Sequence, residues 1–338
     1  MFRGRKGMKD FKNKIAFITG GASGAGFGQA QVFSEAGMKV VIADIRQDHL
    51  DEAMAYFKEK GAPVHAIKLD VTDREGYAAA ADEVEKVYGA PPDLLVMTAG
   101  VNVFGPAEAS TYDDFDWVMG VCLGGVVNGF VTFVPRMIKA GKGGHITSTV
   151  SWGAFSAGAM VAPYTAAKAA VLNLMESYYL ALKPYGIGVS AVCPANIKSR
   201  IYETALNRPE HLNKTGYNVN EKTQGFLASI HQSGMEPRVL ADWLKKGIES
   251  GQFLIIPYPS GPRMVEIELE RFKDYASPEG TRQREELSKQ PPSDEKLKMM
   301  SEREGYEIKP GSTIFNTDNS GFGKARQDLD WIDKSKKI

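Results

Sequence analysis

Short apolar runs, rich in β-branched residues, recur along the first 260 residues and alternate with longer segments of helical periodicity. They predict strands at 15–19, 40–43, 64–69, 94–97, 145–150, 187–192 and 253–256. Strands that are apolar throughout are typical of a parallel sheet with both faces covered. We therefore predict an α/β fold, a doubly wound parallel sheet of about seven strands with helices on both faces, joined by right-handed crossovers.

The pattern changes after residue 198. Residues 199–237 are polar with scattered apolar positions, which predicts a lid over a substrate rather than a further strand. Residues 261–338 are rich in charge and form a predicted C-terminal extension, either partly disordered or wrapped around a neighbouring subunit. Residues 1–10 form a basic leader without the apolar run of a secretory signal, which leaves 11–260 as the catalytic domain.

The composition narrows the class of ligand and the compartment. Lys plus Arg and Asp plus Glu each total 41, so no net charge favours nucleic acid or an anionic membrane. Cys122 and Cys193 cannot build a disulfide framework, which indicates the reducing cytoplasm. The five histidines are scattered without metal-ligand spacing, so we predict no metal. The longest apolar stretch, 118–138, is interrupted by polar residues and a proline and predicts a buried helix rather than a membrane span.

The stretch ITGGASGAGFGQA, residues 18–30, follows the first predicted strand directly. Its glycines at Gly20, Gly21, Gly24 and Gly26 fall within seven positions. A glycine-rich turn between a strand and a helix leaves backbone N–H groups free to bind a pyrophosphate at the start of the helix. The turn alone is weak support for a nucleotide site, since many glycine-rich turns only connect elements.

Further residues carry a resemblance to a family. Thr19 and Gly20, followed by Gly24 and Gly26, resemble the T-G-x-x-x-G-x-G motif of the short-chain dehydrogenase/reductase family. The resemblance covers roughly residues 10–260 and implies a Rossmann-type fold with a nicotinamide cofactor.

The predicted cofactor is NAD. Asp44 ends the second strand, where a carboxylate meets the ribose hydroxyls and repels the 2′-phosphate of NADP. Arg46 lies close by, either as a solvated surface charge or as a group that weakens this preference. The resemblance implies the other cofactor contacts: Gly20, Ser23, Gly24, Gly26, Asp70, Val71, Ala99, Gly100, Tyr164, Lys168, Pro194 and Ile197.

The candidate catalytic residues are Ser151, Tyr164 and Lys168. In YTAAK the tyrosine and lysine stand four residues apart, which places both on one face of a helix. An ammonium group beside a tyrosine stabilises its phenolate, so the pair can act as an acid and base. The resemblance implies that Ser151 binds the reacting oxygen and that Lys168 also holds the nicotinamide ribose. The hydroxyl residues at 147–149 are alternative candidates for the role of Ser151, but they lie within the predicted strand and more readily pack there or bond to its backbone.

Three positions depart from the family pattern. Thr98 and Ala195 replace an asparagine and a glycine, and Cys122 stands where the family has the asparagine of its catalytic tetrad. Cysteine is a weaker hydrogen-bonding group and cannot replace the amide directly, so we expect an altered proton path. We interpret Cys122 as a small buried hydrophobic residue in preference to a redox sensor. We interpret Asn128 as structural, because six residues along a helix rotate it away from the face of Cys122.

The sequence resembles a subgroup that contains hydroxysteroid or bile-acid dehydrogenases and bacterial aryl-ether Cα-dehydrogenases. Both oxidise a secondary alcohol on a bulky, mostly apolar molecule, and we place a hydroxysteroid first and an aryl ether second. A non-catalytic NAD(H)-binding scaffold or redox sensor is the alternative of another class. Packing in the core or in subunit contacts would explain the remaining large apolar side chains of this region as well as a place in the substrate pocket does. These candidates for the pocket are Trp152, Phe155, Met160, Tyr202, Tyr217 and Phe226.

The expected partners are a small-molecule alcohol or ketone and further copies of the chain. The resemblance implies a homodimer or homotetramer that pairs the helices near 112–140 and 161–185.

Overall fold

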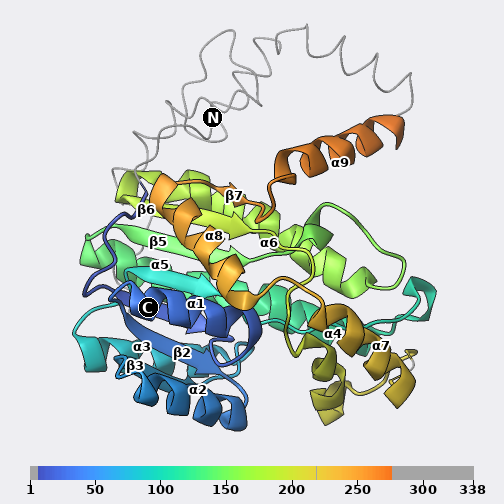
Figure 1. The fold of residues 1–338 in the computed structure, drawn as a ribbon, viewed down its shortest axis with the longest axis horizontal. Helices are drawn as coiled ribbons and strands as arrows, with labels where there is room; N and C mark the ends of the chain where they lie inside the picture. The colour runs from blue at the N-terminus through green and yellow to red at the C-terminus, as the bar shows by residue number, and fades with distance from the viewer. Residues whose placement is uncertain (1–6, 218, 276–338) are drawn as a thin grey trace, which may run out of the picture. The chain divides into compact units, whose positions relative to one another are not determined.

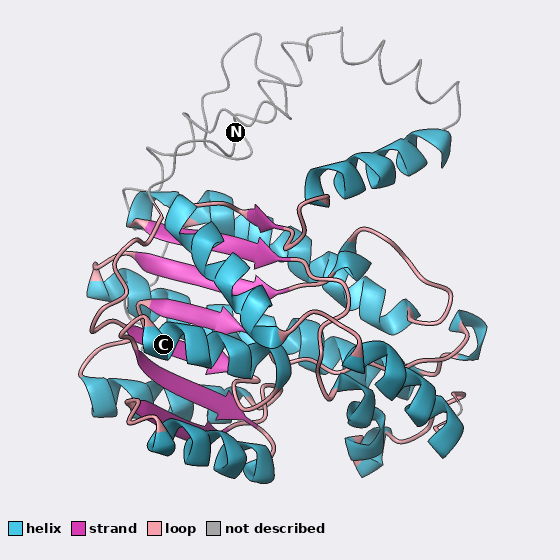
Figure 2. Ribbon diagram, viewed as in Figure 1, coloured by secondary structure: helices cyan, strands magenta, loops and turns pink. Residues whose placement is uncertain are grey.

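The computed structural model describes residues 7–217 and 219–275. Its centre is a sheet of seven parallel strands in the order β3-β2-β1-β4-β5-β6-β7 (Figures 1 and 2). The strands are β1 Ile15–Thr19, β2 Lys39–Asp44, β3 Val64–Lys68, β4 Leu94–Met97, β5 Gly144–Thr149, β6 Ile187–Val192 and β7 Leu254–Ile255. The order reverses between β1 and β4, where a doubly wound sheet opens a crevice at the carboxyl ends of its strands.

The helices follow the strands along the chain. The longer ones are α1 Gly24–Glu35, α2 Gln47–Glu59, α3 Arg74–Tyr88, α4 Tyr112–Met119, α5 Gly125–Ala140, α6 Ala162–Ala181, α7 Glu221–Gln232, α8 Pro237–Ser250 and α9 Gly261–Tyr275. The short ones are η1 Ala107–Ala109, the π-helix η2 Gly120–Gly124, η3 Trp152–Ala154, η4 Lys183–Tyr185, η5 Ile201–Asn207 and η6 Glu210–Leu212.

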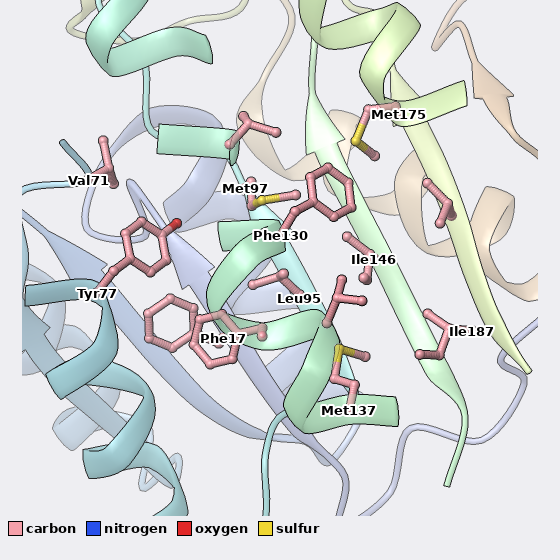
Figure 3. Close-up of a cluster of buried hydrophobic side chains, with 14 of the residues drawn as sticks. Phe17, Val71, Tyr77, Leu95, Met97, Phe130, Met137, Ile146, Met175 and Ile187 are labelled. Atoms are coloured by element: carbon pink, nitrogen blue, oxygen red, sulfur yellow. The ribbon is translucent and has the colours of Figure 1, made fainter. Parts of the chain in front are cut away.

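Two apolar layers hold the helices to the sheet. On one face α3, α5 and α6 pack through Tyr77, Phe130 and Met175 onto the side chains of β1, β4 and β5 (Figure 3). On the other face α1, α2 and α8 supply Phe33 and Leu244, among others, to a second buried cluster. Both faces of the sheet are covered, and the central strands β1 and β4 are buried along their whole length. The predicted Rossmann-type α/β fold is confirmed.

The predicted strands agree with the structure to within a residue or so, and β7 differs most. It spans only two residues instead of 253–256 because the chain leaves a left-handed turn at Gly251 and reaches Pro257, which has no N–H to donate. Residues 199–237, predicted as a lid, contain the helices η5, η6 and α7. The predicted leader up to residue 6 and the extension beyond 275 lie outside the described residues.

The apolar stretch predicted as a buried helix lies in one continuous helical run, Tyr112–Ala140, formed by α4, η2 and α5. By length and composition this run is the one stretch within residues 7–217 and 219–275 that could cross a membrane. Of its most apolar 18-residue window, 56% is buried inside the protein, as in the core helix of a globular fold.

Candidate active site

The glycine-rich turn between β1 and α1 brings backbone segments together more closely than side chains allow. Gly20 has φ +65°, and a Cβ there would lie 2.8 Å from the backbone of Ala99. A Cβ at Gly26 would lie 2.1 Å from the carbonyl oxygen of Gly20. The start of α1 therefore faces a cavity without a shielding side chain, which is the form of a pyrophosphate cradle.

The cavity has a volume of about 540 Å³ and lies at the carboxyl ends of the strands. Every predicted site residue lines it: Gly20, Ser23, Gly24, Gly26, Asp44, Asp70, Val71, Ala99, Gly100, Ser151, Tyr164, Lys168, Pro194 and Ile197. The structure thus brings these residues together, while their roles stay predictions. Other lining residues were not singled out for the pocket from the sequence, among them Thr98, Trp117, Thr204, His211 and His231.

The six residues named as candidates for the substrate pocket do not line this cavity. Tyr217 is buried against α4 and its hydroxyl lies 2.5 Å from the Ser110 hydroxyl. Trp152 packs on Phe155, and Met160 is exposed at the surface. The packing of Tyr217 and Trp152 agrees with the second reading left open for these residues, a place in the core or in subunit contacts.

Asp44 is fixed at one end of the cavity. Its carboxylate accepts hydrogen bonds from the backbone N–H groups of Arg46 (3.1 Å) and Ala22 (3.4 Å), and burial raises its pKa despite these bonds. The guanidinium of Arg46 is held on Asp48, with its Nε 2.8 Å from Oδ1. Arg46 lines the cavity as well, and its guanidinium is engaged with this neighbouring carboxylate.

The loop after β3 carries Asp70 and Val71, which the family resemblance predicts to contact the adenine, and both line the cavity. Asp70 accepts hydrogen bonds from the backbone N–H (2.9 Å) and hydroxyl (2.8 Å) of Thr72. The amide of Asn128, on α5, donates to the carbonyl of Val71 at 2.9 Å. Asn128 thus fixes the backbone of a predicted cofactor contact and has the structural place expected for it.

The three candidate catalytic side chains meet at the other end. Lys168 and Tyr164 share one face of α6, with the Lys168 Nζ 5.5 Å from the centroid of the Tyr164 ring and 2.9 Å from the carbonyl oxygen of Thr149. A Cβ at Gly153 would lie 3.4 Å from Ser151 Oγ and 3.6 Å from Tyr164 Cε1, so these two groups are neighbours. The arrangement combines a hydroxyl donor, a phenol and a fixed positive charge, which suits proton transfer at an alcohol oxygen.

Cys122 lies within the π-helix η2 and is fully buried. Its thiol donates to the carbonyl of Val101 (3.2 Å) and accepts from the N–H of Val101 (3.4 Å). A Cβ at Gly100 would lie 3.6 Å from its Sγ and 3.7 Å from Lys168 Nζ. The interpretation of Cys122 as a small hydrophobic residue is therefore incomplete, because its thiol bonds to both the carbonyl and the N–H of Val101, close to Lys168.

Cys122→Ala is expected to lower the free energy of unfolding by about 1–3 kcal/mol, because it removes both hydrogen bonds to the partly buried backbone of Val101. Cys122→Ser keeps a donor and an acceptor and should lose less. Urea unfolding of the two variants measures the difference, and an alanine variant as stable as the parent would contradict this role.

The second cysteine gives no support to a redox sensor. Burial raises the pKa of the Cys193 thiol to about 12, so it carries almost no reactive thiolate at neutral pH.

Thr98 belongs to a partly buried network of hydrogen bonds with Gln29 and Thr149. Its hydroxyl donates to Gln29 Oε1 (2.6 Å) and lies 2.8 Å from the hydroxyl of Thr149, to which Gln29 also donates at 3.1 Å. This network ties α1 to the ends of β4 and β5. Thr98 thus retains a hydrogen-bonding role at the position where it departs from the family pattern.

An ion pair anchors the 199–237 segment to α4. Arg208 pairs with Asp114, with side-chain exposures of 7% and 0%, and its guanidinium also lies over the ring of Trp117. Burial alone would raise the pKa of Asp114, but the hydrogen bonds from Arg208 and Thr111 outweigh it and lower the pKa. The carboxylate therefore stays charged, and the anchor depends on its partner.

Arg208→Met is expected to destabilise the protein by about 3–5 kcal/mol, because it leaves a buried carboxylate unpaired. The double variant Arg208→Met/Asp114→Asn should recover part of the loss, since no charge remains. Arg200→Met is the matched control: its pair with Glu52 is exposed and is expected to contribute less than about 1 kcal/mol. Denaturant unfolding and proteolysis of the segment measure both, and equal losses in the two arginine variants would contradict the anchor.

Comparison with known proteins identifies relatives across most of the chain. A family model described as short chain dehydrogenase matches residues 14–209. A C alpha-dehydrogenase of Sphingobium sp. is 53% identical over 82% of this chain and 93% of that protein.

Solved structures extend the likeness. The LigD apo form from Sphingobium sp. strain SYK-6 is 47% identical, with a TM-score of 0.67 over 80% of this chain and all of that one. A short chain dehydrogenase/reductase from Burkholderia phymatum, solved in complex with NAD, is 29% identical, with a TM-score of 0.74 over 80% of this chain and 98% of that one. With its cradle, its Ser151, Tyr164 and Lys168 cluster and these relatives, the chain belongs to the short-chain dehydrogenase family of oxidoreductases.

Proposed function

We propose that the protein is an NAD-dependent Cα-dehydrogenase, which oxidises the secondary benzylic alcohol of an aryl ether to a ketone. The observation that supports it most is the 53% identity to a C alpha-dehydrogenase, over 82% of this chain and 93% of that protein. The hydroxysteroid that the sequence analysis placed first is not supported by these comparisons, which favour the aryl ether placed second.

The residues around the cradle fit NAD. Gly20 and Gly26 leave a surface of backbone that a Cβ would fill, and Asp44 offers a carboxylate to a ribose diol. A 2′-phosphate would meet the same negative charge, and Arg46 is engaged with Asp48. When bound, the nicotinamide accepts the hydride that leaves the alcohol carbon.

The chain supplies the proton chemistry and the orientation. Ser151 Oγ accepts the N–H of Gly153 at 3.0 Å, so its own proton is free to bind the substrate oxygen. Tyr164 takes the hydroxyl proton, and the charge of Lys168, on one face of its ring, stabilises the phenolate form that does so. In the reverse direction the same tyrosine returns the proton to the ketone oxygen.

We further propose that residues 11–260 form the catalytic domain in the cytoplasm, that residues 199–237 act as a lid, and that the chain forms a homodimer or homotetramer. Apolar side chains exposed along the helical run Tyr112–Ala140 support self-association, among them Phe115 at 37% and Val131 at 58% exposure.

The test is a turnover assay with purified protein, NAD or NADP, and two groups of alcohols: benzylic β-aryl ether alcohols and neutral or acidic hydroxysteroids. NADH formation with the benzylic alcohols alone is the expected result. Turnover of the hydroxysteroids alone would contradict the proposed substrate. NADH binding without oxidation of any alcohol would favour the non-catalytic scaffold.

A further inference from the structure

His231 stands out among the residues that line the cavity. It lies next to the last residue of α7, it is only 9% exposed, and neither of its ring nitrogens has a hydrogen-bond partner among the described residues. His211 lines the same cavity but is exposed, so its ring nitrogens are open to solvent for hydrogen bonding. Only the buried histidine of the pair thus has unmet hydrogen-bonding capacity.

Aromatic rings hold the imidazole of His231 in place. It stacks on Tyr202 at 6.4 Å between centroids and meets the edge of Phe104 at 6.2 Å. Burial lowers its pKa, and a weaker hydrogen-bonding interaction with the Ile197 backbone opposes this, although the contact does not reach hydrogen-bond geometry. A ring that is neutral at pH 7 presents one N–H donor and one nitrogen acceptor. A buried polar group left unpaired is costly, so the ring favours a ligand that pairs with it.

The ring belongs to the catalytic part of the cavity. His231 interacts with the backbone of Ile197, three residues after Pro194. The carbonyl of Pro194 accepts the N–H of Trp152 at 2.7 Å, and Trp152 directly follows Ser151 in the chain. Asp44 and Asp70 instead lie at the ends of β2 and β3, on the other half of the sheet. A substrate that reaches Ser151 and Tyr164 would therefore lie closer to His231 than the adenosine does.

We infer that His231 binds a second oxygen of the substrate, a hydroxyl or ether oxygen away from the reacting carbon, and so selects oxygenated aryl alcohols over their hydrocarbon analogues. This inference rests on the proposed function. An ether oxygen accepts from the ring N–H, whereas a hydroxyl can also donate to the other ring nitrogen. A site that pairs with such an oxygen rejects an analogue that lacks it, because the buried ring is then left unpaired.

The experiment combines changes in the enzyme with changes in the substrate. Three alcohols are compared: a benzylic β-aryl ether alcohol that carries a side-chain hydroxyl, its analogue with CH₂ in place of the ether oxygen, and its analogue without the hydroxyl. In the parent enzyme, one of the two analogues should lose about 10- to 100-fold in kcat/KM. In His231→Phe that loss should disappear, because the full substrate falls to the level of the analogue.

Two further variants separate recognition from folding. His231→Gln keeps a donor and an acceptor and should retain part of the selectivity, while His211→Phe, which changes the exposed histidine, should retain all of it. NADH binding should be unchanged in the three variants. If His231→Phe keeps the full selectivity, or if the parent oxidises all three alcohols equally well, the inference is wrong and the proposed function stands. If the parent oxidises none of the three, both are wrong.

Discussion

Tyr164→Phe is expected to lower kcat by about 10²–10⁴-fold, because it removes the group that exchanges a proton with the alcohol oxygen. Binding of NADH should change little, since the ring remains and Lys168 keeps its hydrogen bond to Thr149. Steady-state kinetics with a benzylic alcohol and a fluorescence titration with NADH measure the two effects separately.

Tyr178→Phe is the matched control for this variant. Tyr178 lies on the same helix, α6, and stacks on Phe130 with 3.8 Å between centroids, away from the cavity. It should keep the activity of the parent. Full activity in Tyr164→Phe would contradict the proposed proton transfer, and equal losses in both variants would indicate a defect of the helix instead.

Asp44→Ser is expected to shift the ratio of kcat/KM for NAD over NADP by about 10²-fold toward NADP, because it removes a negative charge from the site of the 2′-phosphate. Adding Asp48→Asn should increase the use of NADP further, since it frees the Arg46 guanidinium from its present partner. The measurement is the rate of reduction of each cofactor over a range of concentrations.

Asp70→Ser tests whether the effect is specific. Asp70 lines the same cavity, and its predicted contact is with the adenine, which both cofactors share. This variant should weaken NAD and NADP alike. A cofactor ratio that is unchanged in Asp44→Ser would contradict the place assigned to this carboxylate.

Local patterns are the reason that the fold and the cofactor cradle could be predicted. Gly20 and Gly26 occupy positions where backbone segments nearly touch, and such a constraint appears directly in the residue type. The spacing of Tyr164 and Lys168 is likewise local, because a helix alone brings both to one face. Predictions of this kind do not depend on how distant segments meet.

The walls of the substrate cavity depend on distant contacts and were harder to predict. Tyr217 packs in a cluster with Trp117 and Val118 of α4, and its hydroxyl contacts that of Ser110, more than a hundred residues earlier in the chain. His231 reaches the cavity because α7 packs beside η5, and neither helix carries a strong periodic pattern. A lone histidine in a polar segment gave no signal that distinguished it from the other four.

The most direct test of the proposed reaction follows the hydrogen on the alcohol carbon. A benzylic aryl ether alcohol with deuterium at that carbon is incubated with the protein and NAD, and both products are analysed by mass spectrometry. We expect one deuterium in the reduced nicotinamide for each ketone formed, and almost no formation of either product in the same time with Tyr164→Phe. Ketone formed without deuterium in the cofactor, or bound NADH without any ketone, would contradict the proposed reaction.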